Sequence, residues 1–378
     1  MKICIFQPGF AGHFLEYLHH IYEAAIKDKE NSFYFIVPNT FQEDKAYLSW
    51  RECPHIHFIE MTDDETRKCG RTNIFTHSFY VSKVFNRYYK QYGFHHVFFL
   101  SLIGVLPMGF FMLPKKVKIS GIIYKIFLYY WKQENLFTKI QDYIKYLMFA
   151  YSSKFYKIFM LNDTASICVL NRHFKTSKFS YLNDPFIPAF HEKRDMKAHY
   201  NLSAKQKLFF HFGSMDTRKG TLDILKALLL LTDQEKEEYC FLFAGKMENE
   251  LRESFFDLYN RLKDMGVKII LADGFCSYEY IENCCQSCDC ILMPYNSLGN
   301  SSGVLGHAAY YDKPVLGPNK GILCKLIKKY KLGVTVKIEA ASIHSSLKLA
   351  LAYKVNGGKY RDAISVDRFQ ETIMQLFQ

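Results

Sequence analysis

Two adjacent cations, Arg218 and Lys219, stand in a loop whose composition suits phosphate binding. The segment 212–220 reads FGSMDTRKG and joins a strand-like apolar run to an amphipathic helix. At such a turn Arg218 offers a planar fork of donors and Lys219 offers a point charge, so together they can hold a diphosphate. Ser214 lies in the same loop. A common surface turn that carries an Arg-Lys pair explains this motif equally well.

A second candidate anion site follows the apolar run 290–294. The segment 299–309 reads GNSSGVLGHAA, and Ser301 or Ser302 would cap the helix that begins there. The N–H groups of Ser302, Gly303 and Val304 would then point at an anion at the helix N-terminus. Ordinary helix capping is the alternative. The presence of both loops in one half of the chain favours a ligand site.

The loop 8–13, which reads PGFAGH, is a third and weaker candidate. Two glycines between a strand and a helix let backbone N–H groups approach an anion. The loop lacks the full G-x-G-x-x-G fingerprint of dinucleotide-binding proteins. A plain tight turn is therefore at least as good an interpretation of this segment.

The elements that must position these loops follow an alternating pattern. In the second half, short apolar runs alternate with amphipathic stretches, as in a parallel sheet with helices on both faces. The first half begins in the same way, with strands at 2–7, 32–37 and 56–61 and helices at 14–26 and 74–92. We therefore expect an α/β protein of two Rossmann-like domains with a ligand cleft between them. Ligands of such sheets bind outside the carboxyl ends of the strands.

The polar segment 191–206 has no apolar periodicity and sets the expected boundary between the domains. Residues 1–195 would form the N-terminal domain. Residues 196–360 would form the C-terminal domain. Residues 361–378 are expected to form a helix that packs back towards the N-terminal domain.

The second half resembles the C-terminal donor domain of GT-B glycosyltransferases, and most closely the retaining family 4 (glycosyl transferases group 1). The likeness is specific over about residues 205–335. It is carried by five segments: 208–220, FLFAG at 241–245, ADGF at 272–275, DCILMPY at 289–295 and HAAYYDKPV at 307–315.

The resemblance assigns roles to individual residues. Arg218 and Lys219 match the cations that hold the donor's diphosphate, and the amides of 302–304 match those that cap it. Phe275 falls on the loop that sandwiches the nucleobase. Gly12 and His13 fall on the loop that faces the diphosphate and the sugar, which makes His13 the candidate polar group beside the reacting carbon. The full donor-binding set is Gly12, Ser214, Arg218, Lys219, Phe275, Ser301, Ser302, Gly303, Val304 and His307.

The family's E-x7-E pair of carboxylates is replaced here by a Ser-Ser-Gly/His variant. The two positions are Gly299 and His307. A neutral His307 could still bind the ribose hydroxyls through one ring nitrogen. Gly299 cannot support the transferred sugar, so either Asn300 or a backbone group replaces the carboxylate or activity is lost. The resemblance implies retention by front-face attack, with cations and helix amides stabilising the leaving diphosphate in place of a metal or another cofactor.

The net charge of the chain indicates which kinds of partner it can attract. The 378 residues include 49 Lys and Arg against 37 Asp and Glu. Between Thr66 and Gln133 there are 11 basic residues and no acidic one. Such a stretch attracts phosphates on nucleic acid, on anionic lipid or on a nucleotide, or it is a solvated basic face. The aromatic residues look buried and not arranged for base stacking, so we expect no nucleic-acid partner.

Two segments invite a membrane interpretation. The run 97–113 is mostly apolar, but Gly104, Pro107 and Gly109 favour two buried strands over a membrane span. The following stretch, 119–132, mixes aromatic residues with Lys125 and Lys132, as membrane-surface segments do, or forms a buried helix. Eleven Cys without a secretory signal predict reduced thiols in a cytoplasmic protein.

Two competing metal motifs are weak. The cluster of Cys284, Cys285, Cys288 and Cys290 straddles a helix end and a strand where the family has small residues, which disfavours zinc or iron–sulfur binding. Asp63 and Asp64 lie in a charged turn. Neither motif changes the expectation that no metal is needed.

The sequence thus predicts a cytoplasmic GT-B glycosyltransferase, peripheral on the inner face of the cell membrane. It would move a sugar from a nucleotide-sugar, UDP-linked in the favoured version, to a glycan or lipid-linked acceptor in surface polysaccharide biosynthesis. Three alternatives stay open. They are a nucleotide-sugar-binding protein without transferase activity, a sugar epimerase on the same fold and a nucleic-acid-binding protein.

Overall fold

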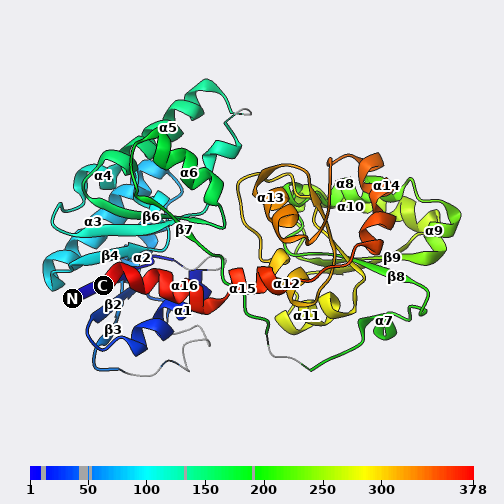
Figure 1. Cartoon of the computed structure of the whole chain (residues 1–378), viewed down its shortest axis with the longest axis horizontal. Coiled ribbons are helices and arrows are strands. Elements are labelled where there is room, and N and C mark those ends of the chain that lie inside the picture. Colours follow the sequence, from blue (N-terminus) through cyan, green and yellow to red (C-terminus); the bar gives the residue numbers. More distant parts are fainter. Residues whose placement is uncertain (10–13, 42–49, 51–52, 132–133, 190–191) are drawn as a thin grey trace. The chain divides into compact units, whose positions relative to one another are not determined.

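The computed structural model describes residues 1–9, 14–41, 50, 53–131, 134–189 and 192–378 (Figure 1). The chain divides into two compact units. Unit 1 consists of Met1–Pro185 together with Val366–Gln378, and unit 2 of Phe186–Ser365. The first boundary falls ten residues before the one expected at 195/196, because the polar segment that follows Phe186 is tied to unit 2. There Arg194 N donates to Asn283 Oδ1 (2.8 Å) and Met196 N to Ser287 Oγ (3.0 Å).

Unit 1 is built on a parallel sheet of seven described strands in the order β3-β2-β1-β4-β5-β6-β7. Its central strands are almost entirely apolar, as expected where helices cover both faces of a parallel sheet. The strands are β1 (Lys2–Phe6), β2 (Ser32–Val37), β3 (Ile56–Glu60), β4 (His96–Phe99), β5 (Lys118–Ile123), β6 (Phe155–Leu161) and β7 (Phe179–Leu182).

Helices cover the two faces of this sheet unequally. Figure 1 shows α3, α4, α5 and α6 over one face, and α1 and α16 over the other. The helices of the unit are α1 (Phe14–Lys27), α2 (Asp63–Cys69), α3 (Ile74–Tyr92), α4 (Met108–Met112), α5 (Leu136–Tyr151), α6 (Thr164–His173) and α16 (Val366–Met374).

The C-terminal segment completes the core of unit 1. Phe369 of α16 packs against Tyr17 of α1, with ring centroids 5.4 Å apart. Phe377, in the 3-10 turn that follows α16, contacts Phe33 of β2 (5.9 Å). Gln370 Nε2 donates a hydrogen bond to the carbonyl oxygen of His20 (3.0 Å). These residues are all buried, so the segment is an integral part of the unit.

Two sequence predictions in unit 1 are wrong. The second strand expected within 97–113 is absent: β4 is followed by a 3-10 turn (Leu102–Val105) and the short helix α4. The alternative of a buried helix over 119–132 is also wrong, because the stretch begins within the buried strand β5. The membrane-surface interpretation of this stretch stays a prediction. Within the described ranges, no helix combines the length and the apolar composition that crossing a bilayer requires.

Unit 2 repeats the architecture with a parallel sheet of six described strands in the order β10-β9-β8-β11-β12-β13. The strands are β8 (Lys207–Phe212), β9 (Tyr239–Gly245), β10 (Lys268–Asp273), β11 (Cys290–Leu292), β12 (Val315–Pro318) and β13 (Gly333–Val336). The helices are α7 (Met196–His199), α8 (Thr221–Leu228), α9 (Asp233–Glu238), α10 (Asn249–Asp264), α11 (Tyr278–Ser287), α12 (Val304–Tyr310), α13 (Gly321–Tyr330), α14 (Ala340–Ala352) and α15 (Gly358–Ala363).

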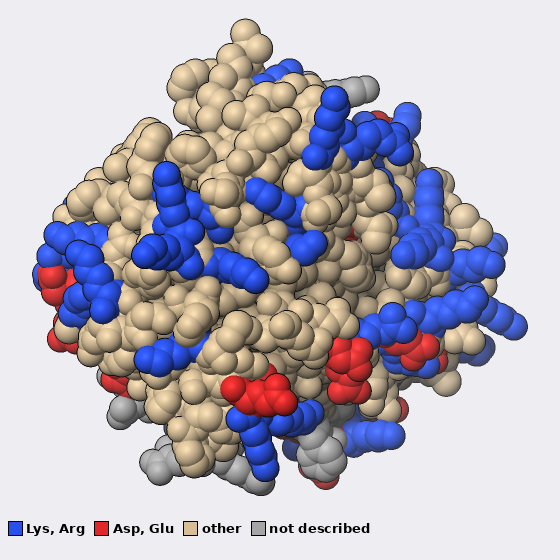
Figure 2. All heavy atoms as spheres, turned by 60° about the vertical axis from the view of Figure 1, so that its left-hand side comes forward, with Lys and Arg blue, Asp and Glu red and all other residues tan. Residues whose placement is uncertain are grey.

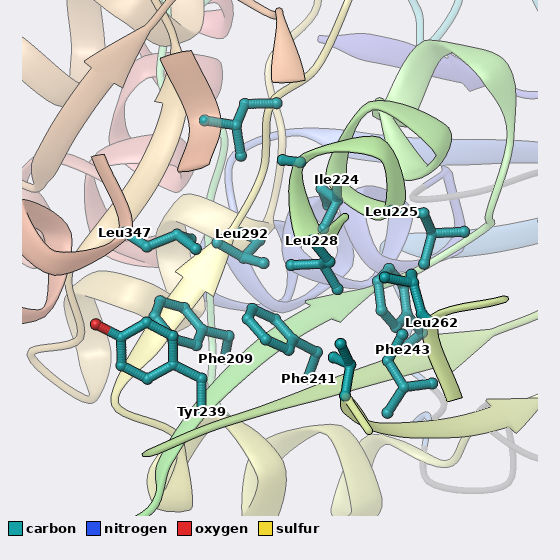
Figure 3. Close-up of a cluster of buried hydrophobic side chains, with 14 of the residues drawn as sticks. Phe209, Ile224, Leu225, Leu228, Tyr239, Phe241, Phe243, Leu262, Leu292 and Leu347 are labelled. Carbon is teal, nitrogen blue, oxygen red and sulfur yellow. The ribbon is translucent and has the colours of Figure 1, made fainter. Parts of the chain in front are cut away.

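The core of unit 2 lies between this sheet and the helices α8, α10 and α14 (Figure 3). Phe209 and Phe241 stack on neighbouring strands, with ring centroids 5.0 Å apart. Leu228 of α8 and Leu347 of α14 close the cluster and are fully buried. This packing fixes the strand ends from which the candidate site loops emerge.

Candidate functional site

The loops that carry the predicted cations and helix amides leave two neighbouring strands of unit 2. From β8 the chain proceeds outward through β9 and β10, whereas β11, β12 and β13 extend in the other direction. The sheet order therefore reverses between β8 and β11. In open parallel sheets such a reversal leaves a crevice at the carboxyl ends of the strands, where ligands bind.

Asp216 organises the loop after β8. Its buried carboxylate accepts from the N–H groups of Arg218 (2.8 Å) and Lys219 (3.1 Å). Its second oxygen lies 2.5 Å from Nη2 of Arg218. The Arg218 side chain is otherwise largely exposed, so its remaining donors face solvent. This ion pair fixes the orientation of the guanidinium in the loop after β8.

Lys219 is held across the reversal point. Its Nζ donates to the hydroxyl of Tyr295 (2.8 Å), a buried residue that follows β11, and lies 4.3 Å from the centre of the same ring. A Cβ atom on Gly213, at the end of β8, would come within 3.3 Å of Nζ. The ammonium group is thereby placed between the ends of the two strands.

At two glycines, neighbouring backbone atoms leave no room for a side chain. Gly220 has a φ of +70°, and a Cβ there would lie 2.1 Å from the carbonyl oxygen of Pro294. Gly245 has a φ of +136°, and a Cβ there would lie 2.0 Å from the carbonyl oxygen of Gly213. Glycine is required because it accepts positive φ and permits this close approach of chains.

The buried His211 links the two strands at the reversal point. His211 Nδ1 lies 2.9 Å from the carbonyl oxygen of Leu292, and Nε2 lies 3.0 Å from Thr221 Oγ1. Burial lowers the pKa of His211 to about 4, so the ring is neutral at physiological pH. Nδ1–H then donates to the carbonyl and Nε2 accepts from the hydroxyl, which connects β8, β11 and the start of α8.

The loop before α12 presents two backbone amides. Ser302 Oγ accepts from Val304 N (3.4 Å), so the Val304 amide that the sequence assigned to the anion is capped by the protein. Among the described residues, no acceptor contacts the amide nitrogens of Ser302 and Gly303. Ser301 is half-buried in the same loop. The loop is fixed from behind by Ile322 N, which donates to the carbonyl of Leu298 (2.8 Å).

His307 has a carboxylate partner that sequence reasoning missed. Its Nδ1 lies 3.2 Å from Oε1 of Glu282, a fully buried residue of α11. The ring packs edge-on against Phe186 (4.6 Å) and against Phe212 at the end of β8 (5.3 Å). Burial alone would raise the pKa of Glu282, but contact with His307, together with Tyr311 and Ala189, lowers it overall.

This contact bears on the absence of the family's carboxylate pair. With Nδ1 turned to Glu282, Nε2 is the His307 nitrogen that remains for a ligand. The side chain is only slightly exposed. A carboxylate is therefore present behind the ring, although none stands at position 307 itself. Gly299 is buried and brings no side chain to the loop.

The other predicted site residues are more peripheral. Phe275 follows β10 and is 93% exposed, which is unusual for a phenylalanine and leaves its ring open to stacking. Ser214 is exposed in the loop after β8. Gly12 and His13 lie outside the described residues. No contact joins Phe275 to the two cations in the described structure, so these residues share only the sheet edge.

Unit 1 has its own cavity at the corresponding place. Its sheet order reverses between β1 and β4, and a cavity of about 270 Å³ lies at the carboxyl ends of these strands. Gln7 and Gly9 line it from the β1 side and Ser101 from the β4 side. His77 of α3 also lines it, with Nδ1 2.6 Å from the carbonyl oxygen of Cys69.

Neither competing metal motif forms a ligand cluster. The four clustered cysteines are buried, and burial raises the pKa of the Cys288 thiol to about 12, which opposes formation of a thiolate. Asp63 and Asp64 begin α2, where Thr62 and Glu65 form a capping box. No group of three potential ligands is placed for a metal in the part of the chain that the structure describes.

Comparison with known proteins agrees with the fold. Residues 192–365, nearly all of unit 2, match the family model of Glycosyl transferases group 1. Unit 2 thus carries a glycosyl transferases group 1 domain, and the predicted class of enzyme, a glycosyltransferase, is confirmed. No match to a curated protein is found.

Several solved structures share the fold over the whole chain at low sequence identity. Sucrose-phosphate synthase from Thermosynechococcus elongatus is 14% identical with a TM-score of 0.75, and the match covers 100% of this chain and 98% of that one. WaaG, a glycosyltransferase involved in lipopolysaccharide biosynthesis, is 15% identical (TM-score 0.67; 100% and 99% covered). Anabaena Alr3699/HepE in complex with UDP and glucose is 14% identical (0.69; 100% and 99%). The predicted GT-B fold of two α/β domains is confirmed.

Proposed function

We propose that the chain is a retaining, family 4-type glycosyltransferase that moves a sugar from a UDP-sugar to a glycan or lipid-linked acceptor in surface polysaccharide biosynthesis. The observation that carries this proposal is the ammonium group of Lys219, held at the reversal point of the unit 2 sheet. We propose that the amides of Ser302 and Gly303, in the loop that follows the neighbouring strand β11, supply donors for the same anion. A diphosphate is the ligand that such a set of charges and N–H groups suits.

Each part of the donor has a proposed contact. Lys219 and Arg218 neutralise the diphosphate, Phe275 stacks on the base, and His307 Nε2 binds the ribose hydroxyls. HepE has been solved with UDP, which supports the choice of nucleotide. The leaving diphosphate is stabilised electrostatically by fixed donors, and this effect is among the largest in catalysis. We propose that no divalent metal is required and that His13 lies beside the reacting carbon.

The acceptor is proposed to bind unit 1. Its cavity at the β1/β4 reversal has polar groups at the carboxyl ends of the strands, where ligands of such sheets bind. The enzyme is proposed to act in the cytoplasm, peripherally on the inner face of the cell membrane. The involvement of WaaG in lipopolysaccharide biosynthesis supports a lipid-linked or glycan acceptor.

Thermal unfolding with UDP, GDP, ADP, CMP and short DNA, each with and without EDTA, tests the donor proposal. Ligand at about 100 times its Kd stabilises a protein by roughly 2.7 kcal/mol, which a melting curve detects. We expect a shift with UDP that EDTA does not alter and that Lys219→Ala abolishes. A shift with DNA alone would reject the proposal. Release of UDP from a panel of UDP-sugars then tests turnover.

A second candidate, nucleotide-sugar binding without transfer, is favoured by Gly299. The position where the family carries the carboxylate that supports the sugar has no side chain. Binding of UDP-sugar with neither transfer nor slow hydrolysis of the donor, on any acceptor supplied, would establish this alternative.

A further inference from the structure

The solvent face of helix α5 in unit 1 is apolar, which reverses the usual pattern of a surface helix. Apart from Gln141, its exposed positions are large apolar or aromatic residues, and most of them recur at helical spacing. Leu136 is 73% and Phe137 70% exposed. The stripe consists of Leu136, Phe137, Ile140, Ile144, Leu147 and Tyr151. The charges Asp142 and Lys145 of the same helix pair with each other (2.9 Å), and their side chains are mostly buried.

The inner face of α5 shows that this orientation is fixed. Tyr146 is fully buried, packed against Phe127 (ring centroids 4.2 Å apart) and stacked with Phe179 (5.7 Å). Phe149 packs edge-on against Phe155 at the start of β6 (5.0 Å). The helix therefore cannot rotate its apolar stripe inward without emptying this core.

The exposed apolar surface continues beyond both ends of α5. At the C-terminal end, Lys154 Nζ donates to the carbonyl oxygens of Phe110 (2.6 Å) and Phe111 (3.3 Å), which fastens α4 beside the turn after α5. The Phe111 ring projects and is 69% exposed. Before the N-terminal end, Trp131 is also exposed, with Lys139 Nζ 6.0 Å from its ring centre.

Cations border this surface. Lys115 and Lys116, in the turn after α4, are exposed. Burial, and after it the charge of Lys115, lowers the pKa of Lys154. The acid-free stretch 66–133 adds no negative charge here. In Figure 2 the top of the molecule, at the height of α5 in Figure 1, is mainly uncharged, with Lys and Arg below it.

We propose that this surface, the α5 stripe with Phe111 and Trp131, is the site at which the protein contacts an anionic phospholipid bilayer. An apolar stripe with aromatic residues and bordering cations lies in the plane of the headgroups, its apolar side chains at the acyl boundary. The lysines add attraction to anionic lipid. The inference rests on the peripheral location proposed above and assigns it to specific residues. A second copy of the chain fits less well, because two such surfaces would bring like charges together.

Co-sedimentation with vesicles of one part phosphatidylglycerol to two parts phosphatidylcholine, compared with phosphatidylcholine alone, tests the site. We expect the wild type to bind the anionic vesicles about tenfold more tightly or better. Phe137→Ser combined with Ile144→Ser should weaken binding to both vesicle types by about tenfold or more. Lys115→Glu with Lys116→Glu should remove mainly the preference for anionic lipid. The matched control is Leu349→Ser, which alters a 58% exposed leucine of α14 in unit 2.

Several outcomes would overturn the proposal. They are a wild type that ignores vesicles, vesicle binding that the α5 variants leave unchanged, or a wild-type dimer in analytical ultracentrifugation that the same variants dissociate. Circular dichroism and the UDP-induced thermal shift of each variant verify its folding. Because vesicle binding needs no donor, a wild type that shows the UDP shift but does not bind vesicles rejects only the lipid site. Vesicle binding without any nucleotide shift rejects only the transferase proposal.

Discussion

Lys219 and Tyr295 are joined across the reversal of the unit 2 sheet, with Nζ 2.8 Å from the phenol oxygen and 4.3 Å from the ring centre. The contact orients a flexible side chain before any ligand arrives. A cation held in this way loses less conformational entropy when it binds an anion than a lysine that is free in solvent. It also keeps its positive charge unneutralised, because the phenol is a neutral acceptor.

Lys219→Ala should weaken binding of UDP about 10- to 100-fold, since a charge-assisted hydrogen bond contributes roughly 1.5–3 kcal/mol. Titration calorimetry of UDP measures this change. Lys226→Ala, which removes an exposed lysine from the neighbouring helix α8, is the matched control and should leave the Kd unchanged. Equal Kd values for wild type and Lys219→Ala would remove Lys219 from the site.

Tyr295→Phe keeps the ring and the cation–π contact but removes the acceptor for Nζ. The lost hydrogen bond orients Nζ and does not itself contact the donor, so donor binding should weaken only about three- to tenfold, less than on removal of the cation. The same calorimetric titration gives the comparison. A larger effect than that of Lys219→Ala would show that the tyrosine hydroxyl itself contacts the donor.

Gly220→Ala tests the close approach of chains in the crevice. The new Cβ would meet the Pro294 carbonyl at 2.1 Å in a residue whose φ is +70°. We expect a loss of about 2 kcal/mol or more in the free energy of unfolding, together with weaker UDP binding. Gly266→Ala is the control, because its φ is +79° but nothing lies within 4 Å, so it should lose only about 1 kcal/mol. Urea unfolding compares the two, and equal losses would contradict the steric argument.

Glu282→Gln should destabilise the protein and raise the KM for the donor. The substitution removes the charge that faces His307 in a buried place, and we expect a loss of about 1–3 kcal/mol in the free energy of unfolding at pH 7. Urea unfolding measures it. Glu279→Gln, at an exposed position of the same helix, should have little effect. A lowered stability with an unchanged KM would assign the pair a structural role only.

Acid should destabilise the protein through His211. Its pKa lies near 4 when folded and near 6.5 when unfolded, so the unfolded state binds an extra proton between these values. The contribution of His211 to the free energy of unfolding is fully present above pH 6.5, and it falls by about 3 kcal/mol as the pH drops to 4. His211→Gln should remove about that much of the pH dependence, as measured by urea unfolding across this range. A slope that the substitution leaves unchanged would refute the neutral buried ring.

The sequence predicts those elements best whose ends carry local signals. Helix α3 was expected at 74–92 and is observed at Ile74–Tyr92, because Asn73 caps its first turn and Gly93 takes the left-handed conformation that ends it. The run 97–113 carries no comparable local signals. Its residues are apolar throughout, and an apolar run fits a buried strand and a buried helical turn equally well.

Within the candidate site, the sequence predicted the types of residue but not the partners that they contact from distant parts of the chain. The cations 218 and 219 follow from the loop composition and the resemblance. The partners Tyr295 and Glu282 come from other strands and helices, and no spacing rule connects them with Lys219 or His307. The buried His211 was likewise hidden, because within an apolar strand it reads as one more core residue. Only the packing of the sheet shows that it bonds to Leu292 and Thr221.

The division of the chain constrains the order in which it can fold during synthesis. Unit 1 takes its last buried residues, among them Phe369 and Phe377, from a segment that follows all of unit 2. On the ribosome, unit 2 can therefore complete its core while unit 1 still exposes the apolar groove that α16 will fill. Unit 1, although first in the sequence, is the last to become complete.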